Sequence, residues 1–196
     1  MSSSYNTQAG NFFGGSNSGV DPRTGLYEFS IPFCHIVGNN RMGPSLTLAL
    51  NYSPTDDINQ GFGRGFSLGQ SCFDSNSSDL LLNTGEKYKV YSCTDYVRQK
   101  KLDNFRFKFS KDQNNLNGYD IIYKNGISEH LSLIGNGIYA VDTITSPIGK
   151  ILKLNWEYTG DGIRLRKVLD ENQILCTFEY TSSAYFTAWP GSPETF

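Results

Sequence analysis

Polar and apolar residues alternate with a period of two along much of this chain, and no other feature limits its fold as strongly. The clearest runs are residues 27–33, 46–52 and 105–109, where Tyr, Phe, Ile or Leu occupies every second position. Successive side chains of a β-strand point to opposite faces, so each run has one apolar face. The 20 glycines supply turns between short strands. The sequence predicts an all-β fold of antiparallel sheets, short strands and successive hairpins, arranged as a sandwich or a partial shell.

Two local features qualify this reading. Pro32 has no amide hydrogen to donate, so its strand is expected to lie at a sheet edge or to carry a bulge. Helical spacing of apolar residues is nearly absent, and the best candidate is residues 94–102, with Tyr96, Val97 and Leu102. We therefore expect under about a tenth of the chain to be helical, against the usual third.

The C-terminal half reads as three consecutive hairpins, formed by residues 119–123 with 127–134, 138–145 with 150–158, and 163–169 with 173–180. The Asn125-Gly126 pair in the first predicts a type I′ turn, which needs two positive φ angles. The last two hairpins are weakly self-similar, since Gly137-Ile138 recurs as Gly162-Ile163 and Trp156-Glu157-Tyr158 as Phe178-Glu179-Tyr180. Repeats of this size must stack on neighbours to bury their apolar faces.

These patterns divide the chain into four parts. We expect a flexible segment at residues 1–19, a β region at 20–110, hairpin repeats at 111–180 and an aromatic tail at 181–196. The tail carries Tyr185, Phe186, Trp189 and Phe196 with no closing strand, so we expect a truncated longer polypeptide.

Charge and hydropathy exclude some classes of protein. A net charge of −2 lacks the basic surface that nucleic acid requires. No apolar run reaches the roughly 20 residues of a membrane span, and the Ser/Asn/Gly-rich start is no conventional signal peptide. We expect folding in a cytoplasm, where Cys34, Cys72, Cys93 and Cys176 would be free, buried thiols.

An ordered series of motifs resembles the N-terminal region of bacterial RHS/YD-repeat proteins, which are related to the insecticidal toxin complexes and include members labelled sugar-binding. The resemblance covers about residues 5–180. Its pieces, in chain order, are VDPRTGLY at 20–27, GNN and GP at 38–44, the strand 46–52 with Ser53-Pro54, GFGRGFSL at 61–68, LNTGEKYKV at 82–90, and KLD at 101–103 before the strand at Phe105.

The resemblance implies a sheet that helps to build a large closed shell around a C-terminal toxin. Two departures put a strict repeat in doubt, because the later YD-type hairpins are degenerate and Phe66 replaces the family's usual Trp. Physically the motifs are turns: Asp-Pro-x-x-Gly suits a type I turn, and the glycines permit a tight or bulged backbone.

Nucleophilic chemistry has two candidates. Gly65-Phe66-Ser67-Leu68-Gly69 matches the G-x-S-x-G elbow of serine hydrolases, but no helix is predicted after Ser67. The only downstream histidine is His130, in a predicted strand. Cys34 and His35 are adjacent and would point to opposite faces of a strand, so a Cys34 pair with His130 is the alternative. We expect neither arrangement to be catalytic.

Ligand binding has three candidates. Asp56, Asp57 and Asp74, near Asn59 and Asn76, could gather oxygen ligands for Ca²⁺, although their spacing fits no EF-hand. Asn51 and Asn76 begin glycosylation patterns, which mean little without a secretory signal. The 12 tyrosines could stack on sugars, but most occupy alternating strand positions and are expected in the core.

The sequence thus predicts a structural, non-catalytic segment of a toxin shell, with no catalytic, cofactor-binding or metal residue and no cofactor. The alternatives are a carbohydrate-binding module and a serine hydrolase using Ser67. Expected partners are the remainder of the same toxin, a second copy in a dimer, or glycans, but neither nucleic acid nor a membrane span.

Overall fold

The protein is almost entirely β-structure. The structure, a computed structural model, describes residues 17–20, 25–56, 58–90, 97, 103–111, 117–160, 162–171 and 173–180. Fourteen strands and one short 3₁₀ helix, Asn39–Arg41, are the regular elements in these ranges. Every strand pair is antiparallel. The predicted all-β fold class is confirmed.

The smaller of the two sheets has four strands in sequence order. They are β1 (Asn17–Val20), β2 (Tyr27–Val37), β3 (Ser45–Tyr52) and β4 (Phe66–Ser67). A compact turn joins β2 to β3, with the 3₁₀ helix inside it and a hydrogen bond from Gly43 N–H to the Gly38 carbonyl. This long hairpin is the part of the smaller sheet that reaches the larger one.

The larger sheet contains a meander in which each strand pairs with its neighbour in sequence. Its strands are β8 (Phe105–Lys111), β9 (Asn117–Tyr123), β10 (Ser128–Gly135), β11 (Ile138–Thr145), β12 (Ile151–Tyr158), β13 (Ile163–Leu169) and β14 (Ile174–Thr177). Strands β5 (Cys72–Asp74), β6 (Asp79–Leu81) and β7 (Lys87–Lys89) join this sheet through β11.

Strand β11 is the branch point of the larger sheet. Along one side it pairs with β10. Along the other, residues 138–140 pair with β5 and residues 143–145 pair with β12. The indole of Trp156 donates to the Val141 carbonyl, and the Val141 N–H donates to Ser71, so the gap between the two partners is also hydrogen-bonded. The sheet can therefore divide without leaving this backbone unsatisfied.

Strand β2 carries a β-bulge at Pro32, as expected. The register with β3 shifts between Pro32 and Cys34, so Cys34 pairs opposite the buried Leu48. Phe33 is turned away from the core and is 49% exposed. Simple alternation, which placed Phe33 on the same face as the preceding apolar residues, is wrong at this residue because a bulge inserts one extra position.

The turn at Asn125-Gly126 differs from its prediction. Gly126 has φ of 84°, but Asn125 does not have a positive φ, so the turn is not type I′. Gly126 N–H bonds to the Tyr123 carbonyl and Tyr123 N–H to Ile127, which makes a three-residue loop with glycine at the bulge position. Two positive φ angles occur instead at Asn136 and Gly137, which form the two-residue connection between β10 and β11.

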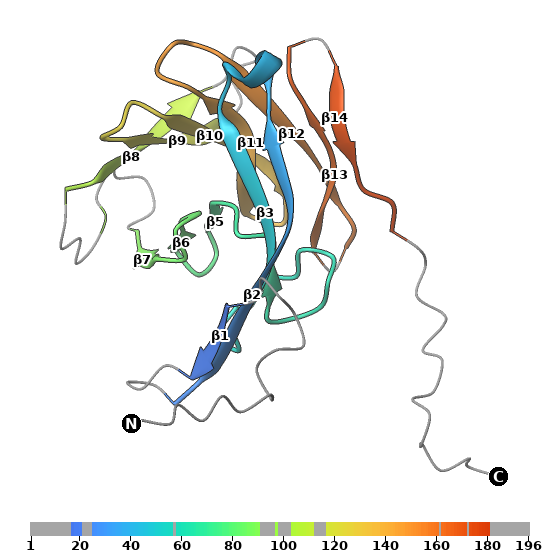
Figure 1. Ribbon diagram of the computed structural model, residues 1–196. Helices are drawn as coiled ribbons and strands as arrows, with labels where there is room; N and C mark the ends of the chain where they lie inside the picture. Colours follow the sequence, from blue (N-terminus) through green and yellow to red (C-terminus); the bar gives the residue numbers. More distant parts are fainter. Residues whose placement is uncertain are drawn as a thin grey trace, which may run out of the picture.

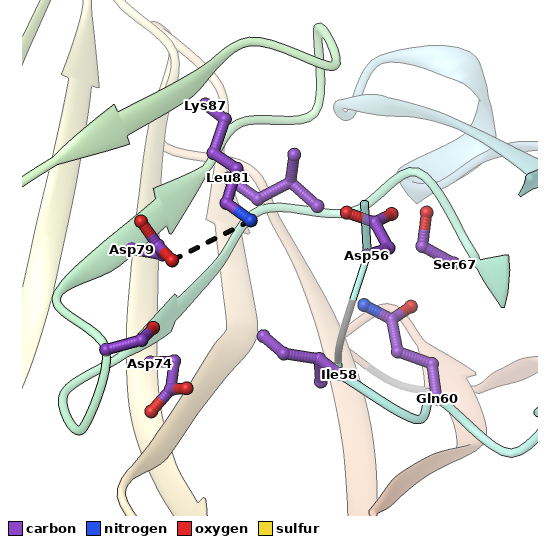
Figure 2. Close-up of a pocket in the computed structure, with 9 residues that line it drawn as sticks. Asp56, Ile58, Gln60, Ser67, Asp74, Asp79, Leu81 and Lys87 are labelled. Carbon is purple, nitrogen blue, oxygen red and sulfur yellow. Dashed lines mark ion pairs between the residues drawn. The ribbon is translucent and has the colours of Figure 1, made fainter. Parts of the chain in front are cut away.

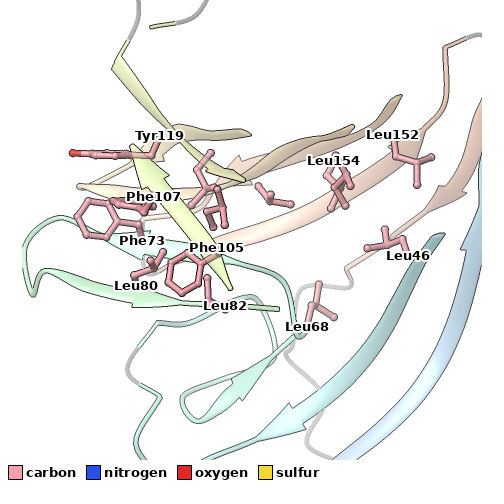
Figure 3. Packing of buried hydrophobic residues seen from close by; sticks show 14 of the residues in the cluster. Leu46, Leu68, Phe73, Leu80, Leu82, Phe105, Phe107, Tyr119, Leu152 and Leu154 are labelled. Atoms are coloured by element: carbon pink, nitrogen blue, oxygen red, sulfur yellow. The ribbon is translucent and has the colours of Figure 1, made fainter. Parts of the chain in front are cut away.

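The core lies between the two sheets and continues under β5–β9 (Figure 3). Figure 1 shows β2 and β3 lying across β12 and β13. At that end Leu46 and Leu48 pack with Leu152 and Leu154. At the other end the core is aromatic, with the Phe107 and Tyr119 rings stacked at 4.9 Å between centroids. Tyr27 and Tyr158 are exposed, so the tyrosines are only partly core residues.

Several predictions fall outside the described residues. These are the 181–196 tail, residues 1–16, the turn at 21–24, Cys93 and the candidate helix 94–102 apart from Val97, which forms an isolated bridge with Val90. Strand β1 begins at Asn17, before the expected boundary at residue 20. Strands β5–β7 share a sheet with the later hairpins, and the division at residue 110 stays a prediction.

Candidate functional site

A groove of about 740 Å³ lies between the smaller sheet and the turn joining β6 to β7. One wall comes from β1, β2 and β3, and the other from residues 81–87. This turn is closed by hydrogen bonds between Leu82 and Glu86 and from Gly85 N–H to the Leu82 carbonyl. The two walls of the groove thus come from segments that are far apart in the sequence.

The hydrogen-bonding side chains that line the groove are mostly uncharged, and apolar residues such as Val20, Leu81 and Leu82 lie among them. Phe29 and Tyr52 contribute rings, and their centroids are 5.4 Å apart in a stacked arrangement. Glu28, Asp56 and Lys87 contribute charges. Hydroxyl and amide groups come from Ser18, Ser30, Thr47, Asn51, Ser53, Thr55, Ser67, Asn83 and Thr84. Such a surface can exchange hydrogen bonds with a hydroxylated ligand or with another polypeptide segment.

A smaller pocket of about 170 Å³ shares Asp56, Ser67 and Lys87 with the groove (Figure 2). Asp79 lies on its wall and pairs with Lys89 at 2.7 Å and Lys87 at 3.7 Å. Burial acts to raise the pKa of Asp79, but the hydrogen bond from Lys89 and the charge of Lys87 outweigh it and hold this pKa below its usual value. The Asp79 carboxylate is therefore ionised, and its charge is balanced by the two lysines.

Two of the side-chain oxygens considered as calcium ligands accept backbone hydrogen bonds within turns. The Asn59 Oδ1 atom accepts the N–H groups of Gly61 and Gly63, and Asp74 Oδ1 accepts the N–H of Asn76. Asp57 lies outside the described residues. Within the described ranges, no group of three or more His, Cys, Asp or Glu side chains is placed to hold a metal ion.

Ser67 lies in the two-residue strand β4, opposite Asn51, and is 4% exposed. Gly65 and Gly69 on either side have φ of 83° and 67°. The chain continues into β5, with no helix after the serine. A hydrolase elbow has a strand before its serine and a helix after it, so this site does not have that geometry.

The histidines lie away from Ser67. His35 bonds through Nδ1 to the Thr47 hydroxyl on the exposed face of β2, while the neighbouring Cys34 packs against the core. His130 Nδ1 is 2.7 Å from Asp120 Oδ1 on β9. Burial acts to raise the pKa of Asp120, but His130 and Lys108 lower it overall. The structure brings neither histidine to Cys34 or to Ser67.

The asparagines of the two glycosylation patterns have structural contacts. Asn51 is half-buried opposite Ser67 and lines the groove. The Asn76 side chain donates to the Asn136 carbonyl at 2.7 Å. Exposed aromatics also have separate partners: Phe33 contacts Phe178, and Phe62 contacts Tyr180.

A buried carboxyl beside the groove was missed by the sequence analysis. Glu129 is 2% exposed and accepts hydrogen bonds from Asn83 Nδ2 at 2.7 Å and from the Tyr123 hydroxyl at 3.0 Å. Burial raises its pKa, while these bonds and one from Ser71 partly offset that effect. The alternation of residues 127–134 could have revealed it, because Glu129 falls in the same phase as Leu131. Glu129 thus links Asn83 of the 82–86 turn to β9 and β10.

No protein-family model and no curated protein matches the chain. Among solved structures it is similar to the N-terminal domain of effector protein SpvB from Salmonella typhimurium strain LT2, with TM-score 0.51 and 15% identity, over 77% of this chain and 66% of that one. It is also similar to TcdB2-TccC3 without its hypervariable C-terminal region, with TM-score 0.53 and 13% identity, over 82% of this chain and 10% of that one.

The Photorhabdus luminescens Tc holotoxin pore is a third similar structure, with TM-score 0.49 and 14% identity, over 79% of this chain and 10% of that chain. The chain thus spans about two thirds of the SpvB domain and a tenth of the TcdB2-TccC3 chain. Among its described residues, no helix is long and apolar enough to cross a membrane. At these identities the first two similarities establish the fold: this chain has a β-fold that also occurs in an effector domain and within a toxin component.

Proposed function

We propose that this chain is a non-catalytic structural segment in the wall of a toxin-complex-type shell of the RHS/YD-repeat class. The observation that carries the proposal is the β8–β14 meander, where each strand pairs with the preceding one. A sheet built this way can be lengthened by adding further hairpins at its edge. The ordered motifs at residues 20–103 and the fold shared with TcdB2-TccC3 also support it.

The edge strand β14 is the place where such a sheet would continue. Within the described residues β14 pairs with β13 alone. Phe178 N–H bonds to the Arg166 carbonyl at 2.8 Å, and Cys176 is in register with Val168. Alternate residues of a strand direct their amides to opposite sides, so the N–H of Thr177 faces away from β13. Thr177 is exposed. Outward amides of this kind can pair with another strand.

Imaging the complete product of the gene that encodes this chain tests the proposal. Electron cryomicroscopy is expected to show a hollow shell with residues 103–180 in its wall and a further strand hydrogen-bonded to β14. A solid particle, or a shell in which these residues lie apart from the wall, would overturn the proposal.

We also propose that the isolated chain self-associates through the same edge, as a symmetric dimer. Sedimentation velocity of Thr177→Pro tests this, because proline removes the outward N–H and leaves the β13 ladder intact. Thr177→Val is the matched control, since it keeps the amide and the β-branched shape. Wild type and the valine variant should associate and the proline variant should be monomeric. Monomers in all three would mean that the edge is already covered.

Carbohydrate binding is a second candidate function. The groove favours it because hydroxyl and amide groups flank the Phe29 and Tyr52 rings. A glycan array with the wild-type chain and Tyr52→Ala distinguishes the two functions. Binding that Tyr52→Ala abolishes would support a carbohydrate module. An array without hits would leave the structural function alone. We propose in addition that the chain folds in a bacterial cytoplasm and is then exported.

A further inference from the structure

Two cysteines from different sheets lie together where the sheets meet. Cys34 is on β2, opposite Leu48, and Cys176 is on β14, opposite Val168. Both pack against the same buried core cluster and both are partly buried. The neighbouring residues confirm that the strands are close, because the rings of Phe33 and Phe178 are in edge contact at 6.3 Å between centroids.

The two thiols also influence each other. Burial raises the pKa of Cys176, and the adjacent Cys34 thiol raises it further through its charge and a side-chain hydrogen bond. Both cysteines are reduced in this structure. The two thiols are thus close enough to interact where β2 and β14 meet, and neither is in a disulfide.

The remaining described cysteine has a different setting. Cys72 is 1% exposed on β5, and its closest polar partner is Gln60 Nε2 at 3.9 Å from the sulfur. Burial, reinforced by Asp56 and Asp74, raises the pKa of Cys72 to about 12. A thiol with almost no exposed surface cannot be reached by a dissolved disulfide, so Cys72 serves as an internal control.

We propose that Cys34 and Cys176 form a disulfide when the protein meets an oxidising environment, and that this bond clamps the edge strand β14 onto β2. The cross-link joins residues about 140 positions apart, and closing so long a loop removes much freedom from the unfolded chain. The inference is independent of the proposed shell function, since it concerns only contacts within this chain.

The oxidant in the reaction is a low-molecular-weight disulfide such as oxidised glutathione. One protein thiol loses its proton, and its thiolate attacks a glutathione sulfur, forming a mixed disulfide and releasing a glutathione thiolate that takes a proton. The second protein thiolate then attacks the protein sulfur of the mixed disulfide and releases the other glutathione. The protein loses two electrons and two protons, and the glutathione disulfide gains them.

Peptide mapping of the full chain after treatment with oxidised glutathione tests the pairing. Non-reducing digestion and mass spectrometry should give one linked peptide pair containing Cys34 and Cys176, which separates on reduction. Cys34→Ser and Cys176→Ser should each lose this species. Cys72→Ser and Cys93→Ser should keep it.

Thermal unfolding gives a second measurement. Oxidation should raise the Tm of wild type and Cys72→Ser by about 5–10 °C, as expected for a long-loop cross-link in a chain of this size. Cys34→Ser should show no oxidant-dependent rise. Should a serine variant fail to fold, wild-type mapping alone decides. Two alkylatable thiols at positions 34 and 176 after oxidation, or a link from either to another cysteine, would overturn the proposal.

Discussion

The backbone N–H of Asn39 donates a hydrogen bond to the Oδ2 atom of Asp170 at 3.0 Å, linking the β2–β3 turn to the end of β13. Asp170 is 9% exposed, and its Oδ1 atom accepts the N–H of Gln173. The Asn39 side chain donates in turn to the Ile151 carbonyl at 3.0 Å. One carboxylate therefore organises two turns that belong to different sheets.

Asp170→Ala is expected to lower the free energy of unfolding by about 2 kcal/mol, because it leaves two backbone amides without the charged acceptor of their partly buried hydrogen bonds. Asp170→Asn keeps one acceptor oxygen and should lose less. The control is Glu171→Ala, which removes an exposed carboxylate paired with Lys150 and should change stability by about 0.5 kcal/mol or less. Urea unfolding measures all three. Equal values for Asp170→Ala and Glu171→Ala would contradict the role assigned to Asp170.

Glu129 gives a prediction about pH. Burial raises its pKa in the folded protein above the ordinary value of 4.5. A carboxyl of this kind contributes its full stability below the unfolded pKa and loses it as the pH rises through the folded pKa. Relative to wild type, Glu129→Gln should therefore become more stable as the pH increases from about 4.5.

The measurement is urea unfolding of wild type and Glu129→Gln between pH 4.5 and 8. The quantity compared at each pH is the free energy of unfolding of the variant minus that of wild type. Glu171→Gln, which removes a surface carboxylate, is the control variant. The difference for Glu129→Gln should rise with pH. A difference that falls with pH would mean that Glu129 is stabilised as a carboxylate in the fold.

Alanine substitutions at two nearby glycines compare the cost of a steric collision with the cost of a left-handed backbone conformation. Gly160 has φ of 81°, and a Cβ there would meet no atom within 4 Å. Gly160→Ala should cost only about 1–2 kcal/mol, the penalty of a left-handed conformation. A Cβ on Gly162 would collide with the backbone carbonyl of Asn59, which accepts a hydrogen bond from Ile163. Gly162→Ala should cost more, about 3 kcal/mol. Guanidinium unfolding would refute this if Gly160→Ala were the more damaging change.

Ser67→Ala tests the absence of serine chemistry. No hydrogen bond from the Ser67 hydroxyl to another described residue is seen, so alanine should change stability by less than about 1 kcal/mol. Hydrolysis of a p-nitrophenyl ester by the wild-type chain should stay at the uncatalysed rate, and the variant should behave identically. Turnover that Ser67→Ala abolishes would identify a hydrolase.

Much of the fold could be predicted because alternation is a local property. The predicted limits of β11 and β13, Ile138–Thr145 and Ile163–Leu169, match the structure. The type I′ turn at Asn125-Gly126 was predicted wrongly because a dipeptide does not set the length of its loop. The pairing of β5 with β11 joins segments distant in sequence, and no local pattern reports such a contact.

The groove was beyond sequence reasoning for the same reason. Its walls come from β1–β3 and from residues 81–87, and only the β6–β7 turn places Lys87 beside Asp56. Some features of single residues were easier to predict from the sequence. The separation of Cys34 from His35 follows from strand geometry, whereas the approach of Cys34 to Cys176 depends on how two sheets pack.

The branch at β11 sets an order for folding during synthesis. Strands β8 to β14 pair with their neighbours in sequence, so each hairpin can close soon after it leaves the ribosome, and such local contacts form quickly. One edge of β5 can pair with β6 as soon as residues 79–81 are made, but its other edge waits for residues 138–140. The Phe73 side chain, fully buried in the finished protein, packs on Phe107 and Tyr119 and is enclosed only when Tyr139 joins them. The nascent chain therefore presents an unpaired edge of β5 for the time needed to synthesise about 60 further residues, a few seconds at bacterial rates. This interval is where a chaperone that holds extended apolar segments would act on the protein.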